Sequence, residues 1–120
     1  MNKERLTVEV ATGSPGIARL TMHGDVDIAA DETLADAYAT AAAAGAERVV
    51  LDFTQVDYIN STGIALIVRL LAEARRDHRV VIAEGLSDHY REISRITRLS
   101  DYLTIADPEP ATSVPEEAAP

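Results

Sequence analysis

The stretch Arg48–Arg76, RVVLDFTQVDYINSTGIALIVRLLAEARR, decides how this 120-residue chain is expected to fold. Its first part, Val49–Leu51, is a short apolar run rich in β-branched residues, which suits a strand covered on both faces. The segment Gln55–Asn60 breaks this run and predicts a short polar turn. From Ile64 onward the apolar residues recur with the period of a helix. The stretch therefore predicts a buried strand, a turn and an amphipathic helix.

The apolar spacing within this helix predicts which side packs on the sheet. Positions i, i+3, i+4, i+7 and i+10 form the expected core face, which consists of Ile64, Ile67, Val68, Leu71 and Ala74. Charged residues occupy the opposite side, namely Arg69, Glu73 and Arg76. Leu66, Arg69 and Leu70 fall outside this face, so their side chains are expected to lie free of the core.

The junction Asn60–Gly63 places hydroxyl groups at a helix N-terminus, at the carboxyl end of a strand, where open α/β sheets meet ligands and partners. A serine nucleophile needs a base within hydrogen-bond reach, but His78 follows the far end of the helix and no G-x-S-x-G turn is present. Two interpretations of Ser61 remain open, a helix cap and a phosphate acceptor, with Thr62 as the second choice of acceptor.

The remaining chain predicts further strands and helices around this unit. Alternation in residues 6–10 and an extended pattern in 17–23 predict an antiparallel hairpin. A helix over 31–44, a strand over 80–83, a helix over 89–96 and an edge strand over 103–105 follow. This order predicts an α/β domain with a mixed sheet, in which the antiparallel hairpin is joined to parallel βα units and helices pack on the sheet. We expect one domain over residues 1–106 and a disordered, acidic, Pro/Ala-rich tail over 107–120.

Composition disfavours several classes of function. A formal net charge of −9, a pI of about 4.6, one Phe and no Trp disfavour binding to nucleic acid or anionic membranes. The sequence contains no Cys, no Walker A motif and no run of about 20 apolar residues. Asp25, Asp27 and Asp31 lack the spacing of a Ca²⁺ loop, so neither a metal nor a cofactor is expected. The N-terminus shows no apolar signal segment, which favours a cytoplasmic protein.

Two motifs carry a resemblance to a known family. Leu51–Phe53 followed by Asn60–Ile64 matches a hydrophobic-Asp-hydrophobic strand end and an Asp-Ser-Ser/Thr-Gly helix start, and Gly24–Asp27 matches the loop after the second strand. In these residues the chain resembles the STAS domain, in the stand-alone form of bacterial anti-sigma factor antagonists. The resemblance spans residues 6–105 and departs at Asn60, where the family pattern has Asp.

The resemblance implies a regulatory binding protein rather than an enzyme. It implies that the unphosphorylated protein binds an anti-sigma factor that is itself a serine kinase, that this kinase phosphorylates Ser61, and that a PP2C-type phosphatase resets the switch. The implied partner-binding residues are Asp25, Asp27, Asn60, Ser61, Thr62, Gly63, Leu66, Arg69 and Leu70. Alternatives are a STAS subunit of a scaffold or transport complex without a phosphoswitch, and a small nucleotide-binding protein or enzyme.

Overall fold

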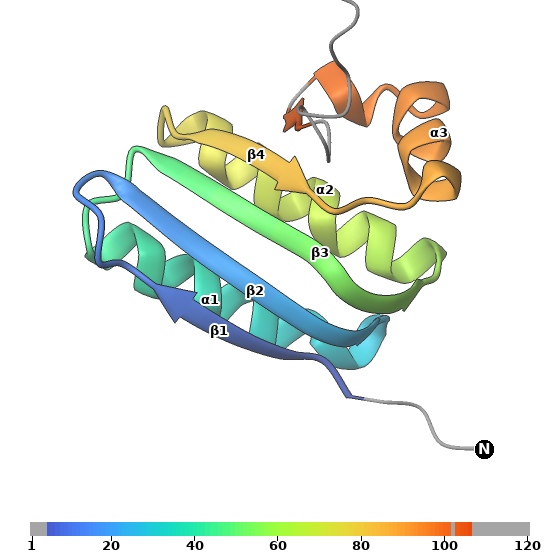
Figure 1. Ribbon diagram of the computed structural model, residues 1–120, viewed down its shortest axis with the longest axis horizontal. Coiled ribbons are helices and arrows are strands. Elements are labelled where there is room, and N and C mark those ends of the chain that lie inside the picture. Colours follow the sequence, from blue (N-terminus) through green and yellow to red (C-terminus); the bar gives the residue numbers. More distant parts are fainter. Residues whose placement is uncertain (1–4, 102, 107–120) are drawn as a thin grey trace, which may run out of the picture.

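Five strands form one mixed sheet in the part of the chain that the computed structural model describes, residues 5–101 and 103–106 (Figure 1). The strand order is β1-β2-β3-β4-β5, with β1 and β2 antiparallel and every later pair parallel. The expected mixed α/β fold is therefore confirmed. The predicted tail, residues 107–120, lies outside the described residues.

The elements follow one another in nearly the expected order. The strands are β1 (Thr7–Ala11), β2 (Ile17–Val26), β3 (Arg48–Ile59), β4 (Val80–Glu84) and β5 (Thr104–Ile105). The helices are α1 (Asp31–Ala43), α2 (Ser61–Arg76) and α3 (Asp88–Ile96), with short 3-10 turns η1 (Ile28–Ala30) and η2 (Leu99–Asp101). Gly45, at φ +77, follows the end of α1 in the left-handed conformation that glycine tolerates, as expected of a helix stop.

Helices α1 and α2 cover one face of the sheet and leave the other face open (Figure 1). On the covered face, alternate β2 residues such as Leu20 and Met22 are fully buried. On the open face, the Arg19 guanidinium donates to Asp52 Oδ2 at 3.1 Å and also pairs with Glu84. Burial of Asp52 opposes its ionisation, but hydrogen bonds from Thr54 and Arg19 outweigh it and lower the pKa of Asp52.

Strand β3 is longer than the sequence predicted, so the expected turn over Gln55–Asn60 is wrong. The segment Gln55–Ile59 continues the strand and pairs with β2 as far as Val26↔Ile59, across two register irregularities. Its polar residues lie at exposed positions, whereas Ile59 is buried. Pairing with the ten-residue β2 supplies the backbone hydrogen bonds that local sequence did not indicate. Asn60 alone separates β3 from α2.

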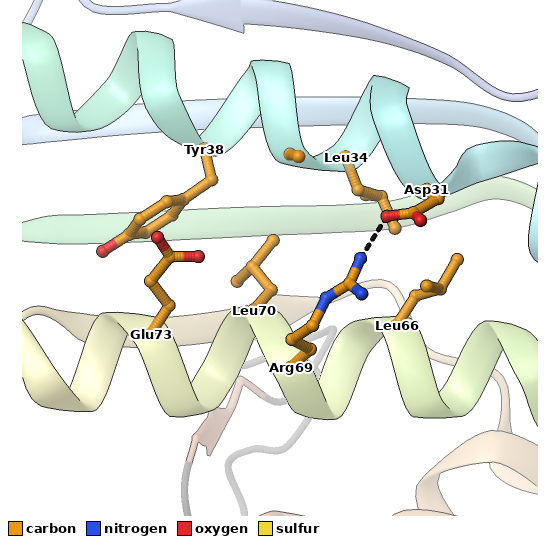
Figure 2. A pocket seen from close by; sticks show the side chains of 8 residues that line it. Asp31, Leu34, Tyr38, Leu66, Arg69, Leu70 and Glu73 are labelled. Carbon is orange, nitrogen blue, oxygen red and sulfur yellow. Dashed lines mark hydrogen bonds and ion pairs between the residues drawn. The ribbon is translucent and has the colours of Figure 1, made fainter.

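The buried side of α2 also differs from the prediction. Ile67, Leu71 and Ala74 are buried as expected, and Ile64 is partly buried. Val68, expected in the core, is 42% exposed, whereas Leu66 and Leu70, expected to be free, are only 7% and 6% exposed. The reason is that α2 packs against α1 as well as the sheet, so its buried arc is wider and is rotated toward α1 (Figure 2).

Candidate functional site

The turn between β3 and α2 is held by Asn60. This residue has extended backbone angles, φ −93 and ψ −178, and its side-chain Oδ1 accepts a hydrogen bond from the Gly63 N–H at 2.8 Å. Its carbonyl accepts from the Ile64 N–H at 2.9 Å. Asn60 is therefore the N-cap of α2, as its residue type allows. Ser61 is the first residue of the helix, and its side chain is not needed for capping.

A close backbone contact locks this turn to the end of β2. The Asn60 N–H donates to the Val26 carbonyl at 3.2 Å. A Cβ atom added at Gly63 would lie 1.9 Å from the same carbonyl oxygen, so only glycine fits there. The two motifs that carry the resemblance therefore meet at the carboxyl edge of the sheet, where α2 begins beside the ends of β2 and β3 (Figure 1).

The end of β2 and the residue that follows it contribute one accessible and one buried carboxylate. Asp27 is only 8% exposed and its Oδ1 accepts from the Ala29 N–H at 3.0 Å, so it caps η1 rather than α1. The N-cap position of α1 is Ala30, which makes no side-chain capping bond. Asp25 is partly exposed and lies opposite Tyr58 in the sheet.

Three expected partner-binding residues lie instead in the seam between α1 and α2. Figure 2 shows Leu66 and Leu70 facing Leu34 and Tyr38 of α1. Arg69 of α2 forms an ion pair with Asp31 of α1 that bridges the two helices, although the Arg69 side chain remains 62% exposed. Leu66 and Leu70 are therefore core residues, which corrects their expected role. Ser61 and Thr62 are exposed, and Asn60 and Gly63 serve mainly to position them.

Two large exposed apolar side chains at this edge were missed by the sequence analysis. Ile28 of η1 is 64% exposed and Tyr58 of β3 is 53% exposed. Neither belongs to the quoted motifs, and periodicity gives no signal for a single exposed residue in a short turn.

The residues at this edge offer one exposed hydroxyl for modification at the first position of α2, that of Ser61. In residues 5–101 and 103–106, no group of three or more His, Asp or Glu is placed to hold a metal ion. Within the same residues, no hydrogen bond ties up the Ser61 hydroxyl. No helix in the described part is long and apolar enough to span a membrane.

Comparison with known proteins places this arrangement in a family. Residues 10–105 match the family described as "Mlab, STAS domain". The anti-sigma-B factor antagonists of Listeria monocytogenes and Listeria innocua are each 35% identical over 65 residues, or 52% of this chain. The match spans 57% of the length of these relatives. BtrV of Bordetella bronchiseptica is 26% identical over 98 residues, 82% of this chain and 84% of its own.

Solved structures support the same fold. The unphosphorylated form of the anti-sigma factor antagonist SpoIIAA superimposes with a TM-score of 0.67 at 17% identity, covering 94% of both chains. The phosphorylated form of SpoIIAA, a Bacillus cell fate determinant, gives 0.65 at 18% identity and covers 94% of this chain and 96% of its own. Because the family match covers nearly the whole described chain, from β1 to β5, the protein belongs to the STAS domain family.

Proposed function

We propose that this STAS domain is an anti-sigma factor antagonist that binds a serine-kinase anti-sigma factor while Ser61 is unmodified. Phosphorylation of Ser61 by that kinase ends the binding, and a PP2C-type phosphatase restores it. The observation that carries the proposal is the exposed Ser61 hydroxyl at the first position of α2, beside a cap that Asn60 already supplies. The names of the Listeria relatives support the antagonist role.

The position of Ser61 lets the domain accept a phosphate without unfolding. Backbone N–H groups at the start of a helix are unpaired, and the helix dipole is positive there. A phosphoserine adds about −1.5 to −2 charges, and a negative charge at this position is favourable by roughly 0.3–1 kcal/mol at an exposed site. The modification therefore leaves the fold intact, and its cost falls on any surface docked against the turn.

Asn60 alters the electrostatics of this site. A carboxylate at the cap would stand beside the phosphate and repel it, whereas the Asn60 amide caps α2 without adding charge. The phosphorylated form of this chain is therefore less strained than it would be with Asp at position 60. A kinase that acts here recognises the turn without a carboxylate at that position.

Incubation with an anti-sigma serine kinase from the same organism and ATP tests the proposal. Mass spectrometry should find one phosphate on Ser61, absent from Ser61→Ala and retained in Thr62→Ala. Calorimetry should show that Ser61→Asp weakens kinase binding strongly while the melting temperature stays nearly constant. Phosphate found only on Thr62 would reassign the site, and equal affinity of Ser61→Asp and wild type would refute the switch.

A second candidate is a STAS subunit of a transport complex or scaffold that binds without a phosphoswitch, and the departure from the family pattern at Asn60 is the observation that favours it. In that case the kinase would add no phosphate, and Ser61→Asp would bind its partner as wild type does. For either function we propose that residues 1–106 form the working domain. Deleting residues 107–120 should then leave the melting temperature unchanged, and a drop of several degrees would contradict this boundary.

A further inference from the structure

A groove of about 650 Å³ opens between the second half of α2 and the segment where α3 ends and η2 begins. Val68, Leu71 and Ala72 line it from α2, and Thr97 and Leu99 line it from the α3–η2 segment. Leu71 and Leu99 are only 2% and 8% exposed, so they lie deep in the groove, whereas Val68 and Ala72 are exposed. Small-molecule sites have volumes of roughly 300–1,000 Å³, an apolar lining and a few polar groups.

This groove is separate from the turn that carries Ser61. Val68, the nearest groove residue of α2 in sequence, follows Ser61 by roughly 10 Å along the helix axis, at about 1.5 Å per residue. Neither the Ser61 turn nor the end of β2 lines the groove in the described part of the chain. A ligand bound here would therefore have no direct contact with the proposed phosphorylation site.

The charge at one end of the groove is opposite to that of the molecule as a whole. Arg75, Arg76 and His78 line the end at the C-terminus of α2, whereas the chain has a formal net charge of −9. Arg75 already has an interaction elsewhere in the chain. The exposed side chains of Arg76 and His78 make no ion pair or hydrogen bond with residues 5–101 and 103–106. An anion could therefore bind to these two side chains without breaking an existing pair.

The backbone of His78 gives independent evidence that its side chain has a use. His78 directly follows the C-cap of α2 and has a φ of +63, in the left-handed region where glycine is favoured. The equivalent residue after α1 is Gly45, with a φ of +77. The equivalent residue after α3 is Arg98, whose Nε donates to Asp101 at 3.0 Å. His78 has no such bond, so the fold alone does not account for a side chain at this position.

We propose that the groove binds a free anionic amphiphile, a small molecule with an apolar chain and a carboxylate or phosphate at one end. The chain lies against Leu71 and Leu99, where it removes apolar surface from water. The anionic oxygens lie at the other end, where the Arg76 guanidinium and a His78 ring N–H donate hydrogen bonds to them. The basic residues in the last turn of α2 also suit the helix dipole, but the dipole does not explain the apolar groove beside them.

Calorimetry and NMR with the full-length chain and decanoate test this site. Decanoate and decyl phosphate should bind and shift the amide resonances of Val68, Ala72 and Thr97. Decanol and decyltrimethylammonium have the same apolar chain without the anion, so they should bind on the order of tenfold more weakly. Equal binding of decanol would overturn the assignment of the anion, and failure of both anionic probes to bind would overturn the site.

Two alanines of α2 provide a matched pair of variants. Ala72→Phe fills the groove and should abolish decanoate binding. Ala65→Phe makes the same change at an exposed alanine of the same helix that lies outside the groove, so it should bind as wild type does. Both changes are at exposed positions, and melting curves should show that both proteins fold. Equal decanoate affinity of the two variants would refute the location of the site.

His78→Gly separates a ligand-binding role from a structural one. Glycine removes the cost of the left-handed backbone, so the melting temperature should be at least that of wild type. The loss of one hydrogen bond should lower the affinity for decanoate about three- to tenfold. Arg98→Gly is the matched control, because it makes the same backbone change at a residue that does not line the groove and should keep wild-type affinity. Wild-type affinity of His78→Gly would refute the role of its side chain.

Two further measurements distinguish other occupants of the groove. Sedimentation with phosphatidylglycerol vesicles should show no binding, and binding that Ala72→Phe abolishes would assign the groove to a membrane surface instead of a free amphiphile. A chain without residues 107–120 should bind decanoate as the full-length chain does, and tighter binding would assign the groove to the C-terminal residues. Because neither the kinase nor Ser61 enters these measurements, their failure would leave the proposed function standing, and the reverse also holds.

Discussion

Replacing Gly63 with alanine tests whether the lock between β2 and α2 has the strength that the geometry indicates. The added Cβ would lie 1.9 Å from the Val26 carbonyl oxygen and 2.7 Å from its carbon. Both are backbone atoms in a paired strand, so they cannot rotate away. The start of α2 must therefore move away from β2 by about 1 Å, the kind of backbone shift that an overpacked core forces.

The expected loss of stability follows from three terms. Overpacking costs about 1–3 kcal/mol, and stretching the bond from Asn60 N–H to Val26 removes about 0.5–1.5 kcal/mol. The higher helix propensity of alanine offsets about 1 kcal/mol of this loss. The net effect should be a loss of about 0.5–3.5 kcal/mol, with a midpoint near ~2 kcal/mol, and a loss of ~2 kcal/mol lowers the melting temperature of a domain of this size by roughly 8–10 °C.

Urea unfolding monitored by circular dichroism measures this loss directly. Gly13→Ala is the matched control, because no heavy atom beyond its two chain neighbours lies within 4 Å of a Cβ added at Gly13. That variant should be as stable as wild type or slightly more stable, since alanine restricts the unfolded chain. A Gly63→Ala protein as stable as Gly13→Ala would refute the contact and the packing of α2 against β2 that it implies.

Three further changes separate the roles assigned above. Asn60→Ala removes the side-chain bond to the Gly63 N–H and should cost about 1 kcal/mol in urea unfolding, whereas Asn60→Asp should cost little; equal loss in both would argue against capping. Leu66→Ala should lower the free energy of unfolding by about 2–5 kcal/mol, because it creates a cavity between α1 and α2. A loss of kinase affinity without a loss of stability would instead assign Leu66 to the partner-binding surface. Asp52 has a lowered pKa in the fold, so its contribution to stability is present above its ordinary value of 3.8 and is lost as the pH falls through the folded pKa. Asp52→Asn should therefore show a weaker fall in stability below about pH 4, and an unchanged pH profile would refute the stabilising bonds that Asp52 accepts from Thr54 and Arg19.

Element type and order could be predicted from the sequence because period-two and helical patterns depend on local residues. A side-chain cap at the start of α2 could also be predicted, since few residue types hold a helix N-terminus with their side chains, but the sequence offered Ser61 for this role and the structure uses Asn60. The length of β3 could not, because Gln55–Ile59 becomes strand only through pairing with β2. Nor could the need for Gly63, which depends on a carbonyl 37 positions earlier in the chain, at Val26.

The sequence predicted the buried and exposed faces of α2 incorrectly, and the reason concerns which apolar residues are left for binding a partner. An apolar stripe predicts which residues can be buried, but two neighbours competed for this helix, the sheet and α1. Packing against α1 turned Leu66 and Leu70 inward and left Val68 outward. Val68 is therefore an apolar residue that suits a core, but its position on α2 faces solvent in this fold. Exposed apolar residues mark interaction sites when they form a contiguous patch.

The contacts that hold the Ser61 turn would determine where the effect of the proposed phosphate is felt. The Asn60 cap, its bond to Val26 and the absence of a side chain at Gly63 hold the first turn of α2 in one arrangement. The turn cannot move aside for a phosphate on Ser61 unless the two hydrogen bonds of Asn60 break. Its bulk and charge must therefore be accommodated by whatever is docked against the helix. A flexible loop could change its conformation to accommodate part of the added bulk and charge. A helix start that is held in place cannot, so nearly all of the steric and electrostatic cost would fall on the docked partner.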